Sequence, residues 1–176
     1  LSPIHAKILE LGGQMGCYNG WERANWFARE GDDISIVSAQ TWERNGPWEK
    51  RVKEECEAVR DGVGVLDLPG FSRFELKGKD CQDLLNGLIV GNLPSTGRIS
   101  LSYFSDHRGR ILTEMSIMKH SNQHFTLITA AAAQWHDYEL LLRSIDPNSD
   151  ISLEDKSEEV GTLIVTGPKS RDLFNK

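Results

Sequence analysis

Residues 97–131 read GRISLSYFSDHRGRILTEMSIMKHSNQHFTLITAA, and this stretch decides the fold. It contains three runs rich in β-forming residues, at 99–104, 111–118 and 125–129. The turn sequences Asp106–Gly109 and His120–Gln123 separate these runs. Connections of about four residues are too short for a parallel crossover, so the stretch predicts an antiparallel β-meander.

The central run carries one carboxylate, Glu114, among apolar residues. Period-2 alternation places it on the same face as Leu112, Ser116 and Met118. Because both faces of this run are largely apolar, we expect a strand covered on both sides and a buried Glu114 with a chemical role. A solvated Glu on the open face of an antiparallel sheet is the alternative, and the residues of the strand leave both open.

Length and composition limit the possible classes. A chain of 176 residues suits one domain or slightly more, and 39% hydrophobic with 26% charged residues is ordinary for a globular protein. The net charge is −6 and the basic residues are scattered, which argues against nucleic acid or an anionic membrane as partner. No apolar run reaches the roughly 18 residues of a membrane-spanning helix. The first residue is Leu1 rather than Met, which predicts a fragment or a processed product.

Cysteines and histidines give no sign of a metal centre. The three cysteines are widely spaced, which predicts free structural thiols in a reducing compartment: Cys17, Cys56 and Cys81. The five histidines are spread through predicted turns and helices, and no pair has ligand spacing together with a carboxylate. We therefore expect no metal ligands. The common nucleotide-binding and hydrolase motifs are absent too.

The rest of the chain alternates helical and strand patterns. Helices are predicted at 3–11, 48–61, 79–88, 130–143 and from Pro168 onward. Strands are predicted at 63–67, which we expect to be buried, and at 71–77, 151–153 and 161–167. The aromatic-rich residues 20–27 are interpreted as a packed loop or an interface, and residues 29–47 as a surface connection. The fold class is therefore α+β, a mainly antiparallel sheet with flanking helices.

Several short segments, in order and at fitting distances, resemble one known family. They are Ser2–His5, Leu9–Gly12, Gly20–Glu22, Ala58–Asp67, Phe74–Gly78, Gly109–Glu114 and Val165–Lys169. Together they resemble the N-terminal part of the glycine-cleavage T-protein (aminomethyltransferase) superfamily, across nearly the whole chain. The resemblance implies a T-protein-like folate-binding domain, truncated after its first part.

The longer segment GWERANWF, residues 20–27, narrows the resemblance. It resembles the junction between the flavin-bearing and folate-binding halves of dimethylglycine and sarcosine dehydrogenase-like flavoproteins. The insert before Trp48 and the segment Leu66–Phe71 favour the same branch. This implies a junction segment at 1–47, following an upstream FAD domain, and a folate-binding part at 48–176.

The resemblance also assigns site residues. Glu114 occupies the place of the family's carboxylate beside tetrahydrofolate, and is therefore the expected catalytic residue. By ungapped register the family's folate-contacting side chains fall on Leu101, Met118 and Ala130, none of which has a polar side-chain group. Tyr103 lies two residues beyond Leu101 on the same face, so it is a candidate substitute for the missing tyrosine.

The implied function is the tetrahydrofolate-binding part of an FAD-dependent demethylating dehydrogenase. Such an enzyme passes a one-carbon unit from an N-methyl amino acid to tetrahydrofolate and forms 5,10-methylene-tetrahydrofolate. The flavin domain of the same polypeptide is the expected partner, and the expected location is the bacterial cytoplasm or the mitochondrial matrix. Two alternatives remain: a stand-alone aminomethyltransferase-like enzyme, and a non-catalytic interaction module with the same fold.

Overall fold

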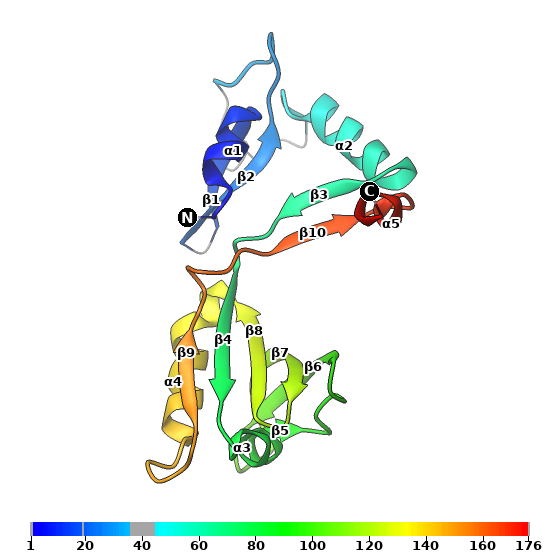
Figure 1. Ribbon diagram of the computed structural model, residues 1–176. Coiled ribbons are helices and arrows are strands. Elements are labelled where there is room, and N and C mark those ends of the chain that lie inside the picture. Colours follow the sequence, from blue (N-terminus) through cyan, green and yellow to red (C-terminus); the bar gives the residue numbers. More distant parts are fainter. Residues whose placement is uncertain (1, 19, 36–44, 176) are drawn as a thin grey trace. The chain divides into compact units, whose positions relative to one another are not determined.

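The computed structural model describes residues 2–18, 20–35 and 45–175, and it divides into two compact units. One unit comprises residues 1–69 and 161–176, and the other residues 70–160 (Figure 1). Among the described residues, no helix is long and apolar enough to cross a membrane.

The unit of residues 70–160 is built on a six-stranded antiparallel sheet with the order β5-β6-β7-β8-β4-β9. Its strands are β4 (Phe71–Lys77), β5 (Ile89–Val90), β6 (Arg98–Ser105), β7 (Ile111–Ser121), β8 (His124–Ala130) and β9 (Ser152–Asp155). The predicted meander is confirmed as β6-β7-β8 (Figure 1). β5 was not predicted, since a two-residue strand leaves almost no pattern in the sequence.

Two helices cover one face of this sheet, α3 (Cys81–Leu88) and α4 (Gln134–Ser144), the latter after a 3-10 turn at Ala131–Ala133. Their apolar stripes complete a core with the inward side chains of the strands, whose buried members are Phe74, Leu76, Cys81, Leu85, Ile89, Phe104, Met115, Ile117, Phe125, Leu127 and Leu141. The fully buried Asp137 on α4 accepts hydrogen bonds from Thr113 and Thr129, which ties this helix to β7 and β8. The helix predicted at 79–88 is confirmed with its apolar stripe. The helix predicted at 130–143 begins later, at Gln134, and it buries Leu141 while Trp135 and Leu142, which were expected on its apolar stripe, are exposed.

In its described residues the other unit contains two small antiparallel pairs of strands and three α-helices. The strands are β1 (Gly13–Tyr18), β2 (Trp21–Phe27), β3 (Gly64–Asp67) and β10 (Leu163–Thr166), paired as β1-β2 and β3-β10. The helices are α1 (His5–Glu10), α2 (Glu49–Asp61) and α5 (Ser170–Phe174). The pairing of β3 with β10 joins segments almost 100 residues apart in the chain (Figure 1).

Three predictions for this unit were wrong. Residues 21–27 form a strand rather than a loop, because pairing with β1 satisfies their backbone groups and buries Trp26. β3 is not buried, since Val65 and Leu66 are 59% and 52% exposed. Pro168 precedes α5 instead of opening its first turn. Most of the predicted connection at 29–47, residues 36–44, lies outside the described residues.

The three cysteines are free thiols, as predicted, and only Cys81 is buried. Burial raises the pKa of the Cys81 thiol to about 11, so this thiol stays protonated and inert at neutral pH.

Candidate functional site

The second face of the six-stranded sheet is open within its unit, and it carries the predicted site. In β7 the alternation sends Met115 and Ile117 into the core, while Glu114 points to the opposite face and is exposed. The expectation of a buried Glu114 is therefore wrong for this unit, and the open-sheet alternative describes its surroundings. The error arose because apolar side chains on a strand do not reveal whether a second layer covers them.

The strand register gathers the predicted residues on this open face. Tyr103 on β6 lies directly opposite Glu114, and Leu101 lies directly opposite Ser116. Side chains of directly opposite residues are about 5 Å apart at Cβ, so the phenol and the carboxylate are neighbours. The expected common face of Tyr103 and Leu101 is confirmed by this pairing.

Met118 on β7 and Ala130 on β8 are the other two predicted site residues. Met118 lies opposite Ile99 on β6 and opposite Thr126 on β8. On β8 the register pairs Ser116 with Ile128, and Ala130 follows beyond the end of the paired residues, on the same face of β8 as Ile128. Met118 lies four residues along β7 from Glu114.

Glu114 is surrounded by exposed apolar side chains, which we call the open-face patch: Val90, Ile99, Leu101, Tyr103 and Leu112, exposed by 59%, 52%, 56%, 43% and 41%. A cluster of exposed apolar groups around one carboxylate is unusual for a solvated surface and typical of a site that binds a partner or ligand. A flat heteroaromatic ring fits such a surface, because its faces contact apolar groups while its N–H groups donate to the carboxylate.

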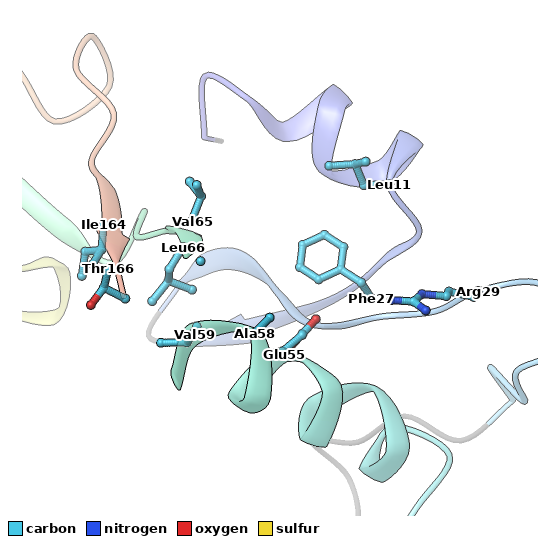
Figure 2. A pocket seen from close by; sticks show the side chains of 11 residues that line it. Leu11, Phe27, Arg29, Glu55, Ala58, Val59, Val65, Leu66, Ile164 and Thr166 are labelled. Carbon is cyan, nitrogen blue, oxygen red and sulfur yellow. The ribbon is translucent and has the colours of Figure 1, made fainter. Parts of the chain in front are cut away.

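A cavity of about 570 Å³ lies in the other unit (Figure 2). Its walls are mainly apolar and consist of Leu11, Phe27, Arg29, Glu55, Ala58, Val59, Gly64, Val65, Leu66, Ile164 and Thr166. Desolvation by burial raises the pKa of Glu55, and the neighbouring Arg29 opposes this rise. None of the predicted site residues lines this cavity.

The structure also assembles a group of residues that the sequence did not indicate. Glu75 on β4 meets His120 and His124, which flank the β7–β8 turn, with their ligand atoms within 4.8 Å of one another. The sequence placed the two histidines four residues apart without a nearby carboxylate. Glu75 is 45 or more residues away in the chain and becomes a neighbour only when β4 pairs with β8.

Comparisons with known proteins agree with the fold and the resemblance. The family model described as "GCVT N-terminal domain" matches residues 4–176. Mitochondrial dimethylglycine dehydrogenase of Rattus norvegicus is 32% identical over 171 residues, which cover 97% of this chain and 20% of that protein. The 4-methylaminobutanoate oxidase (formaldehyde-forming) of Paenarthrobacter nicotinovorans is 30% identical over 176 residues, which cover 99% of this chain and 21% of that protein.

A solved structure shares the fold at much lower identity. Glycine cleavage system aminomethyltransferase T from Bartonella henselae superposes with a TM-score of 0.72 at 15% identity, covering 98% of this chain and 42% of that one. The chain spans about a fifth of the length of the first curated relatives it matches. On the family match over nearly its whole length, this chain belongs to the family of the GCVT N-terminal domain.

Proposed function

We propose that this chain is the tetrahydrofolate-binding part of an FAD-dependent demethylating dehydrogenase. The substrate of that enzyme is a small N-methyl amino acid of the dimethylglycine or sarcosine type, and the product is 5,10-methylene-tetrahydrofolate. The proposal is supported by family membership and by the names of the relatives, which include dimethylglycine dehydrogenase and sarcosine oxidase subunit alpha.

One observation carries the proposal: a single carboxylate, Glu114, stands opposite the phenol of Tyr103 within the open-face patch. The pterin ring of tetrahydrofolate is flat and bears N–H groups, so it needs an apolar contact surface with an acceptor inside it. The patch offers both on the face of the sheet that is open within its unit.

Glu114 would act as the proton carrier of the transfer. The flavin domain of the whole enzyme would supply the iminium by oxidising the N-methyl amine, and no residue of this chain is proposed for that chemistry. Attack by the folate N5 on the iminium carbon forms a C–N bond, and the N5 proton passes to Glu114. The carboxylic acid returns this proton to the departing demethylated amine while the folate N10 closes on the same carbon, losing its own proton to the carboxylate. A nearby carboxylate also stabilises the cationic intermediates.

A non-catalytic module is the second candidate, and one observation favours it. Leu101, Met118 and Ala130 replace the polar side chains of the family pattern, and all three lie on the open face. An exposed apolar patch around a carboxylate also suits a protein partner. A stand-alone aminomethyltransferase is the remaining alternative, and it would bind folate at the same residues.

Calorimetric titration with tetrahydrofolate tests the proposal. The intact protein is expected to bind tetrahydrofolate, and Glu114→Ala is expected to weaken binding by about tenfold or more, the loss typical of one charge-assisted hydrogen bond. Glu158→Ala, which removes an exposed carboxylate from the same unit, serves as the matched control and should bind normally. Absence of binding by the wild-type protein would refute the proposal in favour of the interaction module.

A further inference from the structure

Glu75, His120, His124 and Thr126 form a connected polar cluster on the open face, at the β7–β8 turn. The two imidazole rings stack with centroids 4.3 Å apart and an interplanar angle of 24°. Nε2 of His120 lies 2.8 Å from Oγ1 of Thr126, and this hydroxyl donates to Oε1 of Glu75 at 2.6 Å. Nε2 of His124 is hydrogen-bonded to the other carboxylate oxygen, Oε2.

Two features of the strand pairing bring these side chains together. The ladder between β7 and β8 shifts its register between Lys119 and Ser121, so His120 is an extra residue that remains on the open face beside His124. On the next strand, Glu75 lies directly opposite Thr126. Both features depend on pairing between separate strands, so neither histidine is held by its own strand alone.

The hydrogen-bond pattern fixes where the protons are. The Thr126 hydroxyl has one hydrogen and gives it to Glu75, so Nε2 of His120 must donate to the Thr126 oxygen. Nε2 of His124 donates to Glu75 in the same way. One ligand atom of each of His120, His124 and Glu75 lies within 4.8 Å of the other two, a spacing that a cation can bridge once the histidine nitrogens are free of protons.

We infer that His120, His124 and Glu75 bind a divalent transition-metal cation, with Zn²⁺ as the representative ion. Two imidazole nitrogens and one carboxylate oxygen are a donor set typical of zinc, and three protein ligands leave one position for water or another ligand. Tetrahedral ligands about 2.1 Å from zinc are roughly 3.4 Å apart, so the atoms must close in from a spread of up to 4.8 Å. His120 is exposed, and rotation of its side chain supplies this movement.

The charged groups around the cluster nearly balance, so the site depends on its three ligand groups. The Glu75 carboxylate accepts hydrogen bonds from Thr126 and His124, which hold its oxygens at the cluster. Glu154 on β9 lies directly opposite Glu75 but pairs with Lys156 at 3.1 Å, and Lys77 lies directly opposite His124. The bound ion would join the tip of the β7–β8 hairpin to β4.

Calorimetry with ZnCl₂ on the metal-stripped intact protein at pH 7.5 tests the site. Wild type is expected to bind one equivalent at this cluster, and His120→Ala, His124→Ala and Glu75→Gln should each weaken binding at least about tenfold. His107→Ala is the matched control, because His107 is an exposed histidine in the other hairpin turn of the meander. Unchanged affinity in the three ligand variants, or none in wild type below millimolar Zn²⁺, would overturn the inference.

Two further readouts separate this site from the exposed thiols and from general effects on folding. Zn²⁺ should raise the thermal unfolding midpoint of wild type and His107→Ala but not that of Glu75→Gln, which keeps the size of the side chain. Co²⁺ bound at the site should lack a thiolate charge-transfer band, whereas such a band would assign the metal to Cys17 or Cys56 and contradict the proposal. Folate binding is measured separately, so failure of either proposal leaves the other standing.

Discussion

At the scale of single residues, Arg51 and Asp32 form a well-defined charge pair in the unit of residues 1–69 and 161–176. The guanidinium donates from Nε to Oδ2 at 2.7 Å and from Nη2 to Oδ1 at 2.9 Å, a bidentate pair that only arginine can form. The Arg51 hydrogen bonds, together with the Arg29 backbone N–H, lower the pKa of Asp32 to about 2. This pair links α2 to the segment that follows β2.

Asp32→Asn should therefore change the acid stability of the protein. A carboxylate whose folded pKa is lowered stabilises the fold above its unfolded pKa of about 3.9, and this contribution is lost as the pH falls toward 2. The variant should be less stable than wild type at pH 6, and the difference should shrink steadily between pH 4 and pH 2. Urea unfolding across this range measures it, with Arg51→Lys as an intermediate case; a difference independent of pH would contradict the assignment.

At the scale of elements, α3 is held by a narrow stripe of apolar contacts. Leu85 is fully buried in the core, whereas the adjacent Leu84 is only partly buried. Leu85→Ala should lower the free energy of unfolding by about 2–5 kcal/mol, because the rigid sheet beneath cannot collapse into the cavity. Leu84→Ala should cost clearly less. Denaturant titration of both variants measures their free energies of unfolding. Equal decreases in the two variants would mean that α3 packs differently.

Two glycines with positive φ separate backbone strain from close packing. Gly78, at φ 135° between β4 and α3, would place a Cβ atom 1.8 Å from the carbonyl oxygen of Asp150. Gly109, at φ 75° in the β6–β7 turn, would meet nothing within 4 Å. Gly109→Ala should therefore cost only the conformational strain of about 1 kcal/mol, and Gly78→Ala at least about 2 kcal/mol more. Comparing their unfolding midpoints tests this, and similar losses would contradict the close approach to Asp150.

At the scale of the whole molecule, the proposed function divides the reaction into amine oxidation and folate capture. Glu114 belongs only to the second, so Glu114→Gln in the intact enzyme should leave flavin reduction by substrate unchanged. Formation of methylene-tetrahydrofolate should slow by about 10²–10⁴-fold, the range typical of losing a general acid–base group. Anaerobic flavin spectra and product assays measure the two steps, and an equal loss of both would count against the role of Glu114.

Much of the fold is contained in local sequence patterns. The meander of residues 97–131 was predictable because alternation and short polar turns act within a few residues of each other. The apolar stripe of α3 was predictable for the same reason, whereas on α4 the apolar pattern did not show that Trp135 and Leu142 stay exposed. β2 was missed because its aromatic residues resemble a packed loop until β1 is available to pair with them.

The candidate site, like the fold, was only partly predictable from the sequence. The sequence by itself determined that Leu101 and Tyr103 share a face of one strand and that Glu114 and Met118 share a face of the next, because the side-chain period of a strand is a local property. Only the tertiary structure decided that this face is open within its unit, that Tyr103 stands opposite Glu114, and that Glu75 joins His120 and His124. These facts depend on pairings and layers between segments far apart in the chain, and no local pattern encodes which distant strand becomes the neighbour.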